Sequence, residues 1–192
     1  QPKEIEGPFK LKMKTNTTAV TVHRGDNLSL TGGAVSSSLR WFNVTPETVG
    51  NVKGLKYTET LHTPTNATGK LEGTVAWDQP LGDTKVVYGA TGSENKTSKK
   101  LGSIYRPITV TVLETTKKYD PVAGTQVDIA NPNNVSEDEK SKIINSVKTA
   151  NPDLPAESQY SVDEKGNLTI TYPDKSTDKI SAAYLVNPTK DT

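Results

Sequence analysis

Apolar and polar residues alternate through most of the first 112 positions, in short runs separated by Gly, Pro or Asn. The stretch VTVHRGDNLSL (20–30) shows the alternation twice, once on each side of a polar turn. A period of two places successive side chains on opposite faces of a strand, so each run predicts a half-buried β-strand. Many short strands at this spacing predict an Ig-like β-sandwich over residues 1–116. Further strands are predicted at 39–44, 55–61, 69–77, 83–92 and 104–115.

The pattern changes in the polar stretch around 115–120, and a small α+β module is predicted over residues 117–192. Ser136 followed by Glu139 forms a capping box, which predicts a helix that ends at Asn151-Pro152. The surrounding runs read as strands in the order β-α-β-β-β, with one helix packed on a short sheet. The apolar stripe of the helix consists of Ile143, Ile144, Val147 and Ala150. The alternating apolar residues of the last predicted strand are Ile180, Ala182, Tyr184 and Val186.

The composition narrows the possible functions. Only 32% of the residues are apolar, the mean hydropathy is −0.60 and the net charge is +1, with no cluster of Lys and Arg. A nucleic-acid partner is therefore not expected, because binding phosphates requires clustered positive charge. A membrane span is not expected either, since no run approaches about 20 apolar residues. The absence of cysteine excludes disulfides and thiol nucleophiles.

Two stretches resemble known bacterial surface modules. LGDTKVVYGATGSENKT with PITVTV (81–112) resembles the closing strands of bacterial Ig-like and cadherin-like modules. The helical stretch 131–155 and GNLTITYPDKSTDKI (166–180) resemble a helix-bearing, Rib-like or β-grasp-like module of wall-anchored adhesins of staphylococci, streptococci and lactobacilli. The resemblance implies a segment of a Gram-positive surface protein in which such domains act as spacers or as part of an adhesive tip. It also implies an extracellular location at the cell wall.

Arg24-Gly25-Asp26 is the tripeptide that many cell-adhesion receptors read. A structural interpretation competes with this one, because Gly accepts a positive φ at a bend and Asp bonds nearby backbone amides. The turn interpretation is preferred, and receptor binding through this tripeptide is kept as a hypothesis.

The remaining candidates are two aromatic and two acidic residues. Trp41 and Trp77 could stack on a sugar, although burial in the core is the preferred interpretation. Asp78 and Asp83 flank a short loop and could bind calcium, but the regular ligand spacing of an EF-hand is absent. The preferred alternative is a simple turn. No other cofactor is expected.

No enzyme is predicted, because the two histidines are far apart in the sequence and no nucleophile or phosphate-binding motif is present. The preferred function is a stalk or spacer that supports or contributes to adhesion, with neighbouring domains of the same surface protein as its partners. The alternative is a ligand-binding adhesin head that recognises a host glycan or matrix protein.

Overall fold

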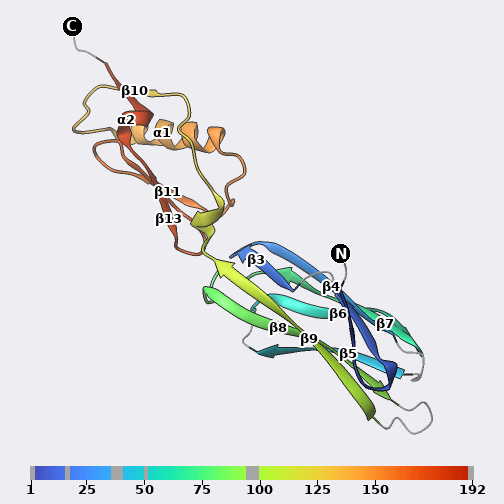
Figure 1. The fold of residues 1–192 in the computed structure, drawn as a ribbon. Coiled ribbons are helices and arrows are strands. Elements are labelled where there is room, and N and C mark those ends of the chain that lie inside the picture. The colour runs from blue at the N-terminus through green and yellow to red at the C-terminus, as the bar shows by residue number, and fades with distance from the viewer. Residues whose placement is uncertain (1–2, 16–17, 36–40, 50–51, 94–99, 190–192) are drawn as a thin grey trace. The chain divides into compact units, whose positions relative to one another are not determined.

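The structure is a computed structural model that describes residues 3–15, 18–35, 41–49, 52–93 and 100–189. The chain divides into two compact units, Gln1–Leu113 (unit 1) and Glu114–Thr192 (unit 2) (Figure 1). This division falls between residues 113 and 114, whereas the sequence placed it between 116 and 117. None of the described helices is long and apolar enough to cross a membrane.

Unit 1 consists of two mainly antiparallel sheets, as far as the described residues show. The larger sheet has the strand order β1-β2-β4-β7-β6 and the smaller one the order β3-β9-β8-β5. The strands of the larger sheet are β1 (Lys3–Glu6), β2 (Lys12–Thr15), β4 (Asn27–Val35), β7 (Asn66–Thr74) and β6 (Leu55–Thr63). Those of the smaller sheet are β3 (Ala19–His23), β9 (Lys100–Leu113), β8 (Gly82–Ser93) and β5 (Trp41–Val49).

Alternation along these strands produces one shared core. In β4, for example, Leu28, Leu30 and Ala34 are buried, whereas Ser29 and Thr31 are exposed. Buried residues of both sheets belong to the same apolar cluster, so the sheets close on each other. The predicted mostly-β fold class is therefore confirmed. The assignment to Ig-like or cadherin-like sandwiches stays a prediction.

Two tyrosines from opposite sheets meet inside this core. Tyr57 and Tyr88 pack edge to face with ring centroids 6.5 Å apart. Glycines make room for them, because a Cβ at Gly69 would lie 1.9 Å from the Tyr57 Oη and one at Gly32 would touch the Tyr88 ring. The Tyr88 hydroxyl donates a hydrogen bond to the Leu30 carbonyl oxygen. Burial raises the pKa of Tyr88 to about 12, so this hydroxyl stays protonated in the core.

Unit 2 is built around α1 (Glu137–Ala150), and the predicted capping box is confirmed. The Ser136 hydroxyl accepts from the Glu139 amide while the Glu139 carboxylate accepts from the Ser136 amide. Ile143 and Val147 are fully buried in the core of the unit. The sheets are an antiparallel one of β11 (Gln159–Val162), β12 (Leu168–Thr171) and β13 (Thr177–Ile180), and a parallel pair of β10 (Val127–Ile129) and β14 (Val186–Pro188).

The last predicted strand of unit 2 is wrong in part. The strand β13 ends at Ile180, and Ala182–Leu185 form a short helix, α2. Ser181 starts this helix because its hydroxyl accepts from the Ala183 amide, and the Asn167 side chain accepts from the Ala182 amide. Tyr184, which a strand would have buried, is 67% exposed. The capping hydrogen bonds therefore favour a helix at Ala182–Leu185, although the apolar residues alternate there as in a strand.

Candidate functional site

One edge of β9 is left without a partner strand over part of its length. β8 pairs with β9 from Gly82 to Ser93, whereas β3 pairs with it only from Thr109 to Leu113. Over residues 102–108, no described strand pairs with the other edge. Pro107 lies in this stretch, and its missing N–H is tolerated at an unpaired edge.

A short 3₁₀ turn, η1 (Pro8–Lys10), packs against the same part of β9. A Cβ added at Gly102 would lie 2.7 Å from the Pro8 Cγ, so the turn and the strand approach closely. Phe9 and Lys10 have φ values of 56° and 60°, a left-handed conformation that costs about 1–2 kcal/mol for a residue with a Cβ. Phe9 is also 53% exposed, so burial does not offset this cost.

Arg106 lies within the unpaired stretch of β9. It stands opposite Tyr88 in the register with β8, between the buried residues Ile104 and Ile108 of its own strand. Its Nε atom is buried and has no hydrogen-bond partner among the described residues. The adjacent Tyr105 is 45% exposed. Tyr105 points to the opposite, solvent-facing side of the strand, because successive side chains alternate. An arginine donor on the core side of an unpaired strand edge is suited to a planar anionic group such as a carboxylate.

The structure places Arg24-Gly25-Asp26 in the turn between β3 and β4. Gly25 has φ +87°, and a Cβ there would lie 2.1 Å from the Trp77 ring. The Asp26 carboxylate accepts from the His23 amide at 2.9 Å, and the Arg24 Nε donates to the Gln79 carbonyl oxygen at 2.7 Å. Each residue of the tripeptide therefore has a role in the turn. These contacts favour the structural interpretation, and receptor binding stays an untested hypothesis.

The other sequence-derived candidates are dispersed. Trp77 lies in the loop after β7, not in a strand as its alternating neighbours suggested, and packs over Gly25. The side chain of Trp41 lies outside the described residues. Asp78 pairs with the Lys53 Nζ at 3.3 Å, and Asp83 accepts from the Thr111 hydroxyl at 2.6 Å. Within the described ranges, no three acidic, histidine or cysteine residues are grouped to hold a metal ion.

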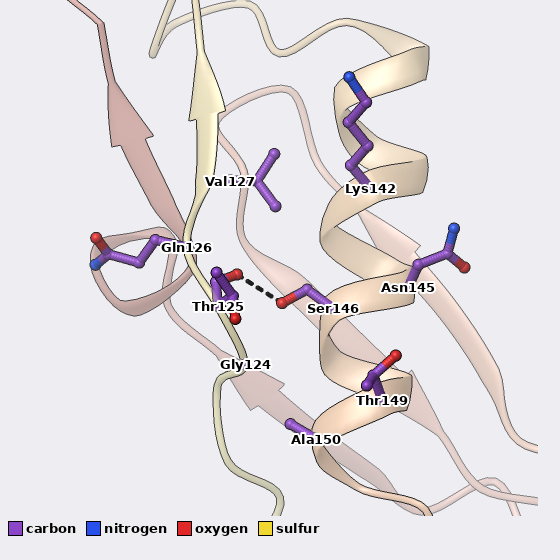
Figure 2. A pocket seen from close by; sticks show the side chains of 9 residues that line it. All are labelled: Gly124, Thr125, Gln126, Val127, Lys142, Asn145, Ser146, Thr149 and Ala150. Carbon is purple, nitrogen blue, oxygen red and sulfur yellow. Dashed lines mark hydrogen bonds between the residues drawn. The ribbon is translucent and has the colours of Figure 1, made fainter.

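Unit 2 contains a surface groove of about 550 Å³ between α1 and the segment that leads into β10 (Figure 2). Polar side chains of the helix line one wall, and Gln126 and Val127 belong to the other. The Ser146 hydroxyl donates to the Thr125 carbonyl oxygen at 2.6 Å, midway between Lys142 and Ala150 in Figure 2. None of the described residues that line this groove carries a buried donor without a hydrogen-bond partner. The groove is therefore a weaker candidate for a ligand-binding site than the β9 edge.

Known proteins resemble this chain in sequence and in fold. Residues 119–189 match the Atypical Rib domain. The chain is 34% identical over 112 residues to a streptococcal hemagglutinin of Streptococcus gordonii, a match that covers 58% of this chain and 5% of that protein. The comparisons support a module of a Gram-positive surface adhesin. The chain spans only a small part of this curated relative.

Solved structures extend the likeness to both units. The SrpA adhesin of Streptococcus sanguinis superimposes with a TM-score of 0.75 over 98% of this chain and 94% of that one, at 21% identity, which shows the shared fold. A sialic acid binding region of a Streptococcus sanguinis SK1 adhesin, bound to 3'sLn, superimposes with a TM-score of 0.72 at 26% identity. It covers 94% of this chain, which spans 48% of that structure.

These likenesses bear on the sequence-based predictions. The Rib-like resemblance of the second region is supported by the family match. The matched proteins are adhesins and a hemagglutinin, which supports an adhesive, non-enzymatic role. Arg106 was not singled out from the sequence. The signal that could have identified it is an arginine beside a proline in a strand, because proline marks an unpaired edge.

Proposed function

We propose that this chain is part of a streptococcal-type surface adhesin, in which unit 1 binds a host glycan that carries sialic acid and unit 2 supports it. The observation that carries this proposal is the buried, unpartnered Nε of Arg106 at the unpaired edge of β9. The likeness to an adhesin region described as sialic acid binding gives the ligand class.

The chemistry of Arg106 matches the carboxylate of a sialic acid. A buried donor without a partner costs about 1–3 kcal/mol, and this cost is recovered when a ligand accepts the hydrogen bond. An arginine fork can bind a carboxylate through two parallel N–H···O bonds. Arg24 is less suited to this task, because its Nε already donates to the Gln79 carbonyl oxygen.

The proposal assigns one of the two functions left open by the sequence, binding head and stalk, to each unit. The sequence favoured a stalk over a binding head for the whole chain. The geometry of β9 favours a head for unit 1, and the Rib-like match of residues 119–189 favours a supporting role for unit 2. Location at the bacterial surface is part of the proposal, as is the host glycan as partner.

The test compares binding of sialylated glycans by the parent chain, Arg106→Gln and Lys85→Gln. Lys85 is an exposed cation of the neighbouring strand β8 and serves as the matched control. Loss of a charge-assisted pair should weaken binding of Arg106→Gln by about 10- to 100-fold, and Lys85→Gln should bind like the parent. The same glycan treated with sialidase should not bind.

Equal binding of Arg106→Gln and the parent, or equal binding of the desialylated glycan, would overturn the proposal. If the correctly folded parent bound none of the sialylated glycans, the stalk interpretation would be preferred for both units. Arg106→Lys separates charge from geometry, because lysine keeps the charge but lacks the planar fork.

A further inference from the structure

In unit 2 the chain enters at one end and leaves at the other (Figure 1). It enters at Glu114 and η2 (Thr115–Lys118), and it leaves after β14. The first and last strands of the unit, β10 and β14, run parallel, with Val127 opposite Val186 and Ile129 opposite Pro188. Tension between entry and exit therefore pulls the start of β10 and the end of β14 in opposite directions along the strands. Their hydrogen bonds are then loaded together, in shear.

The parallel pair is reinforced beyond its ladder. The Asn187 Nδ2 donates to the Asp128 Oδ1 at 2.9 Å, directly across the pair. Thr189 donates twice to the Ile129 carbonyl oxygen, through its amide at 2.9 Å and its hydroxyl at 3.1 Å. These bonds lie at the exit end, where tension would first act on β14. These side-chain hydrogen bonds therefore add to the backbone bonds of a strand pair that is only three residues long.

The segment between the entry point and β10 is also attached along its length. Near the entry, the Asp174 carboxylate accepts from the Thr115 amide at 2.9 Å, and the Ser176 hydroxyl accepts from the Thr116 amide at 3.1 Å. Tyr119 stacks on Tyr172 with centroids 5.6 Å apart. Asp174 and Tyr172 are almost fully buried, so these attachments reach into the body of the unit.

Asn151, the C-cap of α1, and Ser146 within α1 continue the attachment towards β10. The Asn151 side chain accepts from the Val122 amide at 2.8 Å and donates to the Val122 carbonyl oxygen at 2.7 Å, which imitates one step of a strand ladder. The Ser146 hydroxyl then binds the Thr125 carbonyl oxygen (Figure 2). The segment 115–129 is thereby held at successive points by the turn after β12, by α1 and by β14.

The geometry points to a load-bearing role for unit 2: the segment 115–129 and β14 form a clamp that resists tension between the two ends of the unit by shear. This inference goes beyond the proposed function because it concerns unit 2 alone and needs no ligand. Under tension, the rate at which the clamp opens decides its lifetime, and equilibrium stability does not.

Single-molecule force spectroscopy of the full chain, held by cysteines added at its two ends, tests the clamp. The chain has no cysteine of its own, so the attachment points are unique. Extension lengths assign each event, since the roughly 75 residues of unit 2 extend to about 260 Å and those of unit 1 to about 400 Å. Unit 2 of the parent should unfold in one step.

Asn187→Ala removes one exposed side-chain bond of the clamp and should raise the unfolding rate of unit 2 under load by about 2- to 10-fold. Thr189→Pro removes both the amide and the hydroxyl donor to the Ile129 carbonyl oxygen and should raise this rate further. Ser136→Ala is the matched control, because it removes a capping bond of similar strength at the start of α1 in which no residue of the clamp takes part. Its unfolding rate under load should change less.

Equal acceleration by Ser136→Ala and Asn187→Ala would overturn the inference, as would an Asn187→Ala chain that unfolds under load like the parent. Unfolding of unit 2 in several small steps would also overturn it, since a shear clamp opens as a whole. The experiment contains no glycan, so failure of glycan binding and failure of the clamp are observed separately.

Discussion

The edge of β9 in unit 1 and the entry segment of unit 2 treat their polar groups in opposite ways. No described strand pairs with one stretch of β9, and the Arg106 Nε in this stretch is buried without a hydrogen-bond partner among the described residues. In unit 2, side chains bind the segment through which the chain enters. The buried Asp174 carboxylate accepts from the Thr115 amide, and the Asn151 side chain binds both the amide and the carbonyl oxygen of Val122. A surface that binds a ligand must keep donors available until the ligand arrives, whereas a support gains from satisfying them internally.

The largest expected effect tests whether the units are independent. Ile143→Ala removes a fully buried side chain from α1 and should lower the free energy of unfolding of unit 2 by about 3 kcal/mol. Both tryptophans belong to unit 1, so their fluorescence should still report the parent transition. The loss should appear in helical circular dichroism. Equal shifts in both signals would mean that the units unfold together.

A smaller effect should be confined to unit 1. Gly25→Ala places a Cβ against the Trp77 ring at a φ of +87° and should cost about 2–3 kcal/mol, the sum of backbone strain and a forced shift of the ring. Gly82→Ala is the matched control, because Gly82 has φ +100° but nothing within 4 Å of the added Cβ. It should cost about 1–2 kcal/mol, from strain alone. Chemical denaturation followed by tryptophan fluorescence measures both.

The smallest effect is a response of unit 2 to acid. Burial alone would raise the pKa of Asp174, but hydrogen bonds from the Ser176 hydroxyl and the Thr115 amide lower it overall. Backbone donors also lower the pKa values of Glu139 and Asp163. A lowered pKa in the folded state stabilises the fold above the unfolded value of about 4, and this contribution is lost as the pH falls through the folded value.

Unit 2 should therefore lose stability below about pH 4, with a slope that Asp174→Asn reduces. Thermal melting followed by helical circular dichroism, repeated from neutral to acidic pH, measures the slope. A melting temperature of unit 2 that stays constant over this range would contradict the assignment of these carboxylates.

The parts of this fold that depend on local chemistry could be predicted from the sequence. The capping box at Ser136 and Glu139 and the apolar stripe of α1 fixed the helix to within a residue. The short helix α2 could not be separated from a strand, because Ile180, Ala182 and Tyr184 satisfy a period of two, and the bond from the Ala182 amide to Asn167 depends on tertiary contact.

The candidate site depends on pairing between distant strands. Arg106 lies at an unpaired edge because β3 pairs with β9 only from Thr109 onward among the described strands, and no local pattern records where that pairing begins. The same limit applied to Trp77, whose alternating neighbours suggested a strand although β7 ends at Thr74. In both cases the pattern indicated the type of element but not its extent or its neighbours.

The turn at Arg24-Gly25-Asp26 has a consequence for how such sequences are compared. Gly25 is required by its φ and by the Trp77 ring, Asp26 by the His23 amide, and Arg24 by the Gln79 carbonyl oxygen. Natural selection for folding alone would therefore keep these three letters together in related chains. If a scan for receptor motifs found the tripeptide in a related chain, its presence there would not by itself show that a receptor reads it.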